Sequence, residues 1–374
     1  MAAILVTPVV VDRPIEARVP PNLTRGPIAW ARRNLFETPL SSVATVVVGL
    51  VIVYVLARLF GWGIARAVFV PDLDACRALD HSGACWGVIA EKYRLILFGR
   101  YPFDQQWRSL TAMIVLVATV VISCMPRFWN KGIALVWVVG LAAFFVLMRG
   151  GVFGLSYVDS ASWGGLPLTL MLSVLGIAAA FPLAIVVALG RRSKLPGIRT
   201  ICIVYVELIR GVPLISVLFM ASFLFPLFMP PGTNIDVLVR VTVGILLFTA
   251  AYLAEVVRGG LQAVPKGQIE AAEKLGLSYW QTQRTIVLPK ALRLVVPSTV
   301  NSFIATLKDC SLVTIVSLYE LTGALQLAMG DSNWRPFNLE GYLFISLVYF
   351  TCCFAMSRYS HWVEKHLNRG TRRL

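Results

Sequence analysis

The chain has 374 residues, of which 57% are apolar and only 14% are charged. Soluble globular proteins carry roughly 25% charged residues, so the composition excludes an ordinary soluble protein and predicts a polytopic membrane protein in a lipid bilayer. The net charge of +15 does not indicate a nucleic-acid partner, because Lys and Arg gather in short segments between apolar runs. That distribution is typical of membrane topology signals.

Residues 1–40 are expected to form a cytoplasmic, partly flexible tail. The opening segment Met1–Val11 is apolar, but no charged region precedes it and it runs directly into Asp12 and Arg13. It is too short to cross a bilayer and has no clear cleavage site, so we do not interpret it as a signal peptide.

Eight later runs are apolar and long enough to be candidate membrane spans. A helix that crosses a bilayer needs about 20 apolar residues, and the shorter runs can borrow flanking residues. The sequence therefore predicts an all-α polytopic fold with about eight transmembrane helices. The candidates are Ser42–Phe60, Leu110–Met125, Ile133–Leu147, Leu166–Leu189, Gly211–Phe228, Val241–Val257, Leu294–Leu312 and Leu343–Met356.

The composition of the spans changes along the chain. The first three are rich in Val, Leu and Ile, whereas Leu166–Leu189 contains Gly, Ala and Pro. Small residues permit close helix contacts within a membrane. We therefore expect a three-span extension over 41–150, a five-span core over 164–367 and a basic tail over 368–374.

A long outer loop, residues 61–109, separates the first two spans. Apolar residues recur at helical spacing from Val88 to Leu97, which predicts a helix lying on the outer interface. Cys76 and Cys85 share this loop and could form a disulfide if it faces an oxidising compartment, although two free thiols are also compatible with the sequence. No spacing typical of metal ligands surrounds them.

The distribution of Lys and Arg predicts the orientation. With the N-terminus inside, the inner segments contain 22 basic residues and the outer loops contain 9. The positive-inside rule then places both termini in the cytoplasm. Val313–Leu327 is also apolar but is interrupted by Glu320, and we expect it to be an outer-face segment.

The segment 258–292 is too polar to cross a membrane, yet it has a clear helical pattern. It predicts a helix over Gln268–Leu275 that ends with a left-handed residue at Gly276. Ser278 and Gln281 have the spacing of a capping box that opens a second helix. Pro289 is expected to end that second helix.

Several charged residues lie in or beside the spans. Lys308 and Asp309 are well inside one span, where a charge is costly unless it is paired or faces water. They could line a substrate path, as could Glu320, or they could form ion pairs that fix helix packing. The pairs with i, i+3 spacing are expected to be structural salt bridges near the cytoplasmic surface. These are Glu207 with Arg210 and Glu255 with Arg258.

One pattern in the polar segment is more specific. Glu270-Ala271-Ala272 is followed by Gly276 and then, after nine residues, by Ile286, Leu288 and Pro289 of an I-x-L-P sequence. This pattern resembles the cytoplasmic coupling loop of ABC importer permeases, which contacts the ATPase. The resemblance implies that the contact residues are Glu270, Ala271, Ala272, Gly276 and Leu277.

Further stretches resemble permeases of the polar amino acid family, and the three extra spans resemble the M-type subunit of general L-amino-acid permeases. The likeness extends over roughly 164–367, and its stretches are Trp163–Thr169, Glu207–Pro213, Leu307–Val313 and Met356–Ser360. It implies a permease subunit of an ATP-driven importer of polar or general L-amino acids in the bacterial inner membrane. The implied partners are ABC ATPase subunits, a second and different permease chain and a periplasmic amino-acid-binding protein.

The chain contains no Walker A sequence, so the ATP and Mg would be used by the partner ATPase and this subunit would bind no cofactor. No catalytic triad stands out, so we expect a transport subunit and not an enzyme. One alternative remains open, which is an ion-coupled secondary amino acid transporter with Lys308 and Asp309 as its coupling site.

Overall fold

The computed structural model describes residues 26–367 except 81, 131 and 234, so the tail 368–374 and most of the tail 1–40 lie outside the described residues. Within this part of the chain the secondary structure is helical, with only two isolated β-bridges. The α-helices are α1 (Pro27–Leu35), α2 (Pro39–Phe60), α3 (Leu73–Arg77), α4 (Gly87–Phe98), α5 (Gln106–Cys124), α6 (Ile133–Arg149), α7 (Gly165–Gly190), α8 (Pro196–Arg210), α9 (Leu214–Phe219), α10 (Val237–Ala263), α11 (Lys266–Lys274), α12 (Tyr279–Thr282), α13 (Leu288–Asp309), α14 (Leu321–Ala328) and α15 (Asn338–Leu367).

The predicted spans correspond to helices in the structure. Among the described residues, six helices are long and apolar enough to cross a membrane, and a bent pair of helices can provide a seventh. The shorter apolar helix α6 accounts for the remaining predicted span. The prediction of an all-α polytopic protein with about eight spans is therefore confirmed.

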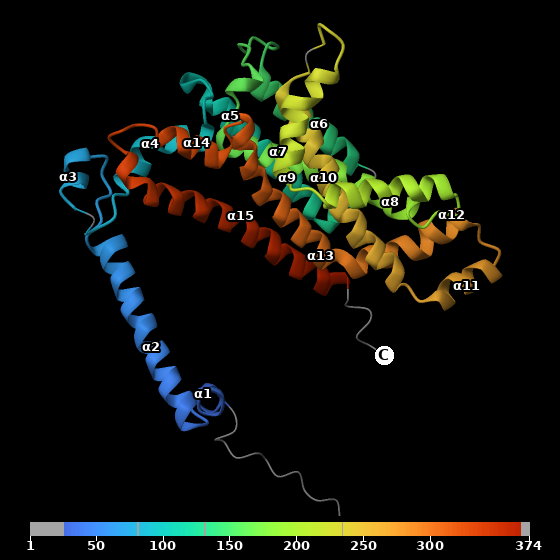
Figure 1. Ribbon diagram of the computed structural model, residues 1–374, viewed down its shortest axis with the longest axis horizontal. Helices are drawn as coiled ribbons and strands as arrows, with labels where there is room; N and C mark the ends of the chain where they lie inside the picture. The colour runs from blue at the N-terminus through green and yellow to red at the C-terminus, as the bar shows by residue number, and fades with distance from the viewer. Residues whose placement is uncertain (1–25, 81, 131, 234, 368–374) are drawn as a thin grey trace, which may run out of the picture. The chain divides into compact units, whose positions relative to one another are not determined.

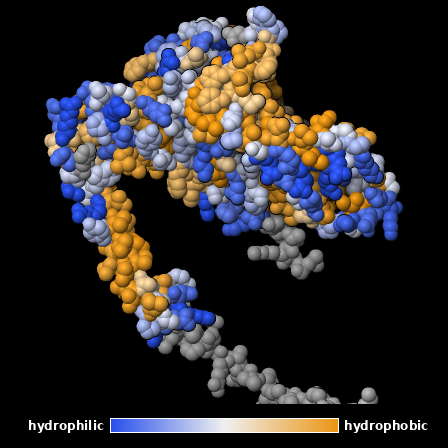
Figure 2. All heavy atoms as spheres, viewed as in Figure 1, coloured by the Kyte–Doolittle hydropathy of each residue, from blue (hydrophilic) through white to orange (hydrophobic). Residues whose placement is uncertain are grey.

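The chain divides into two compact units, and α1 and α2 belong to the first, which ends at Ala67 and also includes Leu79–Ala84. Thr38 and Ser41 form a capping box at the start of α2. No residue of α2 is buried, and Figure 2 shows an apolar surface along the helix. A helix that is apolar on all sides requires an apolar environment, so α2 has the surface of a lipid-facing span.

The second unit contains α3 and all elements from α4 onward, with α10 packed against α7 and α13. Gly176 of α7 permits this contact, because a Cβ there would lie 2.9 Å from Cγ2 of Ile245 in α10. Helices α5 and α6 belong to the same unit. Leu116 of α5 and Phe144 of α6 share one hydrophobic cluster with Met171 of α7. Residues 150–164 are thus a connection within the unit.

Two ends of the second unit differ in content (Figure 1). Helices α13 and α15 pack together and run from the end that contains α4 and α14 to the end that contains α11 and α12. Hydrophilic residues gather over the α11 end (Figure 2). Helix α13 therefore connects the two ends of the second unit, as a helix that crosses a bilayer would.

The predicted helix in the loop 61–109 is present as α4, but its apolar residues have a different role from the expected one. Val88 and Ile96 have no exposed surface, and α4 packs against α14 and α7. The apolar stripe that predicted an interfacial helix is covered by protein. The sequence period identifies a helix with one apolar face, but it does not identify what covers that face.

Pro289 does not end the second helix of the polar segment. A π-helical turn, Gln283–Val287, lies between α12 and α13, and Pro289 occupies the first turn of α13. The amide of Leu288 donates to the carbonyl of Gln283, five residues earlier. Proline lacks an amide hydrogen and clashes with the carbonyl four residues earlier in a regular helix. The wider π turn removes that conflict, so the helix continues from Tyr279 to Val316.

Candidate functional site

The polar segment forms a short helix, α11, that contacts the unit through buried Ala272 and half-buried Ile269 and is exposed elsewhere. Only Val264 and Pro265 separate it from the end of α10, and Val264 is buried in a hydrophobic cluster at this end of the unit. Ala272 is the only buried residue of α11, whereas Glu270 and Ala271 are exposed. Small Ala272 lets α11 lie close to the unit while its outer face stays free.

Gly276 ends α11 in the left-handed conformation, with φ of 75°. The amide of Leu277 donates to the carbonyl of Ala272 at 3.2 Å, and the amide of Gly276 donates to the carbonyl of Glu273 at 3.0 Å. These two bonds define a Schellman motif, in which glycine avoids the strain that a Cβ would cause. Leu277 is half-buried, and its amide closes this turn.

A capping box follows at once. The Ser278 amide donates to Oε1 of Gln281 at 2.8 Å, and the Gln281 amide donates to Oγ of Ser278 at 3.4 Å. Both helix ends at the turn therefore have their backbone groups satisfied by local bonds. The turn between α11 and α12 has a defined geometry that depends only on residues 272–281.

Large apolar residues are exposed on both sides of this turn. Leu275 is 80% exposed and Trp280 is 68% exposed, and Tyr279 lies edge-to-face with Trp280 at 5.3 Å between ring centroids. Exposed aromatic and aliphatic groups that are close together indicate a contact surface. The sequence interpretation did not include these three residues among the contact residues, although apolar residues beside a glycine in a polar segment were an available signal. The surface formed by α11 and α12 is called the coupling segment below.

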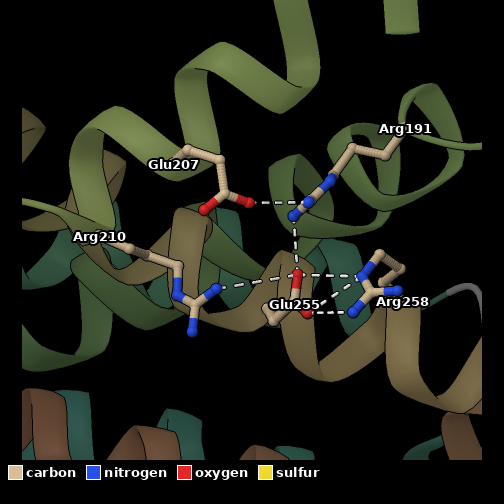
Figure 3. A network of polar contacts seen from close by, with 5 residues as sticks. All are labelled: Arg191, Glu207, Arg210, Glu255 and Arg258. Carbon is tan, nitrogen blue, oxygen red and sulfur yellow. Dashed lines mark hydrogen bonds and ion pairs between the residues drawn. The ribbon is translucent and has the colours of Figure 1, made fainter. Parts of the chain in front are cut away.

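A charged cluster joins α10 to α7 and α8 near the start of this segment (Figure 3). It consists of Arg191, Glu207, Arg210, Glu255 and Arg258. Glu255 Oε2 accepts from Arg191 Nη1 at 2.7 Å, and both Glu255 carboxylate oxygens accept from Arg258 Nε at 3.0 Å. Arg191 Nη2 donates to Glu207 Oε1 at 2.9 Å.

The structure thus shows the predicted contact between Glu255 and Arg258 but a different partner for Glu207. Glu207 pairs with Arg191 and not with Arg210, whose Nη1 lies 3.9 Å from Glu255 Oε2. Arg191 follows the end of α7, where it is close to both carboxylates, and its side chain is only 12% exposed. Sequence spacing alone favours partners on the same helix, so the basic run at 191–194 gave no sign of this role.

Helix α8 was not predicted. It lies between the predicted spans Leu166–Leu189 and Gly211–Phe228, and it meets the following helical segment, Leu214–Phe228, at an angle of 105°. Pro196 at its start and the periodic apolar residues after it were the available signals. The span predicted at 211–228 is therefore the second half of a bent pair.

The three substrate-path candidates do not form one site. Lys308 is exposed on α13, Asp309 is half-buried, and Glu320 is completely buried. Ser298 and Asn301 share the exposed face of α13 with Lys308, at spacings of three and seven residues. This polar face has no protein covering it in the single chain.

Glu320 is held by hydrogen bonds from several elements. Its side chain caps α14 by accepting from the amides of Thr322 and Gly323. It also accepts from the hydroxyls of Thr314 at 3.0 Å and Tyr349 at 2.8 Å. A buried carboxylate needs such donors, so the surroundings of Glu320 indicate a structural role in holding these elements together.

Cys76 and Cys85 form a disulfide in the structure, and the other five cysteines are free. The disulfide closes the short segment between α3 and α4. Cys85 also donates its amide to the buried Glu340 at 2.9 Å, which connects this segment to α15.

Comparisons with known proteins agree with this architecture. The family described as the binding-protein-dependent transport system inner membrane component matches residues 180–369. The chain is 44% identical over 349 residues to the inner membrane amino-acid ABC transporter permease protein YhdY of Escherichia coli (strain K12), covering 92% of this chain and 94% of that protein.

A second relative is the glutamate/glutamine/aspartate/asparagine transport system permease protein BztC of Rhodobacter capsulatus, which is 35% identical over 418 residues, with 93% of this chain and 95% of that protein covered. Among solved structures, one described as an amino acid ABC transporter with histidines matches with a TM-score of 0.49 and 28% identity, over 54% of this chain and 92% of the other. The match to the family over half of the chain, together with close relatives along nearly its whole length, shows that the chain belongs to the binding-protein-dependent transport system inner membrane components.

Proposed function

We propose that this chain is the multi-pass permease subunit of an ATP-driven amino acid importer, and that the coupling segment is its contact with a separate ATPase. The observation that carries the proposal is the rigid turn at Gly276, which presents Leu275, Tyr279 and Trp280 at one end of the second unit. Relatives named as amino-acid transport permeases support the substrate class.

The geometry suits the transmission of movement. The coupling segment is continuous with α10 through two residues and with α13 through the π turn. A partner that binds the exposed apolar surface would therefore move the adjoining ends of α10 and α13 together, as rigid bodies. ATP and Mg would act in the partner, because this chain has no Walker A sequence.

A second permease subunit is the partner that the polar face of α13 favours. Ser298, Asn301 and Lys308 would be exposed to lipid if the chain worked alone, and a charge in that position is costly. A second chain would enclose these residues in a shared path and would be required for transport. Lys308 would then attract the carboxylate of an amino acid, while Asp309 offers the opposite charge. An amino-acid-binding protein would deliver the substrate at the end of the second unit that contains α4 and α14, opposite the coupling segment.

The ion-coupled alternative has less support. It requires neither a coupling segment nor an ATPase, and membership of a binding-protein-dependent family runs against it. The prediction that distinguishes the two concerns Gly276.

In the assembled complex reconstituted in proteoliposomes, Gly276→Val should reduce ATP-driven uptake about tenfold or more, because a side chain in the left-handed conformation costs about 1–2 kcal/mol and displaces the turn. The space around Gly276 is open, so the effect arises from φ and not from a clash. Gly276→Asn should retain most uptake, since Asn adopts this conformation readily.

The matched control is Gly197→Val, at an exposed position near the start of α8, outside the coupling segment, with open space and no positive φ. It should import normally. Co-purification provides a second measurement, in which Gly276→Val keeps the second permease but loses the ATPase. Normal ATP-driven uptake by Gly276→Val, or uptake driven by an ion gradient without any ATPase, would refute the proposed function.

A further inference from the structure

Helix α8 packs against α7 and α10, and Cys202 in its middle lies against the buried cluster at this end of the unit. Val206 is its one buried residue, and the Tyr205 hydroxyl donates to the carbonyl of Leu247 in α10 at 2.6 Å. Farther toward its start, α8 exposes Ile198, Ile201 and Val204. The side-chain hydrogen bonds of α8 therefore lie in its C-terminal half, which leads to the 105° bend.

Two residues of this half, Glu207 and Arg210, belong to the charged cluster (Figure 3). Arg191 donates to Glu207 of α8 with one nitrogen and to Glu255 of α10 with another. A guanidinium is a planar fork, so one arginine can hold two carboxylates in a fixed relation. Arg191 thus sets the position of α8 relative to α10.

Arg210 stands at the bend and has two partners at longer range. Its Nη1 lies 3.9 Å from Glu255 Oε2, and its guanidinium carbon lies 5.5 Å from the centre of the Tyr252 ring. Both partners are on α10, one turn apart. Arg210 can therefore remain in contact with α10 while the bend changes its angle.

The cluster is also close to the coupling segment. Glu255 lies eight residues before the end of α10 at Ala263, which is about two turns of helix. Arg192 adds a hydrogen bond of 3.0 Å from Nη1 to the carbonyl of Leu261. A displacement of α11 would reach Glu255 along α10 before it reached the hydrophobic centre of the unit.

We infer that Arg191 and Glu255 are positioning residues that transmit movement of the coupling segment to the bent pair formed by α8 and Leu214–Phe228. This inference rests on the proposed function and adds to it the route by which ATP-driven movement spreads into the membrane-spanning part. Neither residue touches the substrate. Their contribution is to keep α8 aligned with α10 while α10 moves.

The experiment uses the complete complex in proteoliposomes and measures the amino acid imported per ATP hydrolysed. Arg191→Gln and Glu255→Gln should each reduce this ratio about tenfold, which corresponds to about 1.4 kcal/mol of lost coupling, while ATP hydrolysis continues. The double variant should have the same ratio of import to hydrolysis as either single variant, because both substitutions remove the same connection. Arg191→Lys should give an intermediate ratio, since an ammonium group cannot bridge two carboxylates as a fork does.

The matched control is Arg199→Gln, which removes the same charge from an exposed position of α8 that has no hydrogen-bond or ion-pair partner among the described residues. Its ratio should equal that of the unchanged protein. If Arg191→Gln assembles poorly, Glu207→Gln serves in its place. That residue is 59% exposed in its side chain, and its loss breaks only the connection to α8.

A structural readout separates coupling from simple stability. One spin label is placed at Ile201→Cys in α8 or at Gly267→Cys in α11, and a second label on α15. When ATP binds, the distance to α15 should change for both positions. In Glu255→Gln only the α11 label should move. An unchanged transport ratio, or labels that still move together, would overturn the inference while leaving the proposed function intact, whereas normal uptake by Gly276→Val would refute both.

Discussion

Glu320 is an acidic residue in an apolar region whose role depends on its surroundings. The structure gives its carboxylate donors from Thr314, Tyr349 and two α14 amides, and a further contact of 3.3 Å from the Thr169 hydroxyl of α7. No surface of Glu320 is exposed. An anion in this setting is stabilised by hydrogen bonds and by the N-terminus of α14.

We therefore predict that Glu320→Gln destabilises the protein without changing its selectivity. The amide NH2 of Gln would replace one carboxylate oxygen and would face hydrogen-bond donors. An unsatisfied buried polar group costs about 1–3 kcal/mol. The melting temperature in detergent should fall. Tyr349→Phe removes a single donor and should have a smaller effect. An unchanged melting temperature combined with a raised KM for uptake would show that Glu320 contacts substrate instead.

At the scale of elements, two π turns interrupt the regular geometry of helices. The π turn before Pro289 keeps α12 and α13 in one continuous helix. A second π turn, Met220–Leu224, follows α9, and there Arg240 of α10 donates to the carbonyl of Ser222. Side chains that satisfy freed carbonyls permit such breaks inside membrane-spanning segments. The bent pair thus contacts α10 both beside the bend and in its second half.

The packing of α4 on α14 includes an ion pair with a predictable pH dependence. Lys92 Nζ donates to Asp331 Oδ2 at 2.9 Å. The hydrogen bond from Lys92, aided by the Asn333 amide, lowers the pKa of Asp331 below its usual 3.8. Because the folded pKa is depressed, the stabilisation is complete above pH 3.8 and is lost as the pH falls through the lower folded value.

We expect Asp331→Asn to lower the melting temperature slightly at neutral pH and to have no effect at strongly acidic pH. Melting curves of both proteins across this range measure the difference. Asp104→Asn is a suitable control, because Asp104 is exposed and has no ion-pair partner among the described residues. A difference that grows as the pH falls would contradict the sign of this linkage.

At the scale of the whole molecule, the two ends of α13 define an orientation. Ser278 lies at the coupling segment and Ser332 lies beyond α14, so one continuous helix from Tyr279 to Val316 separates them. The excess of Lys and Arg in the predicted inner segments predicts that Ser278 lies in the cytoplasm.

In intact cells, a membrane-impermeant maleimide should label Ser332→Cys and not Ser278→Cys, in a background without the five free cysteines. Opening the membrane should expose Ser278→Cys as well. Labelling of Ser278→Cys in intact cells would reverse the orientation and would remove the coupling segment from the compartment that contains ATP.

The sequence by itself determined the features that depend on neighbouring residues. Apolar length identified the spans. The positions of Gly276, Ser278 and Gln281 identified the left-handed helix end and the capping box, because the bonds at this turn join residues no more than five apart. Only the tertiary structure decided the contacts between distant residues. Arg191 and Glu255 are 64 positions apart, and Thr169 and Glu320 are 151 apart. Which charges meet over such separations depends on how helices bend and pack, and a local pattern does not contain that information.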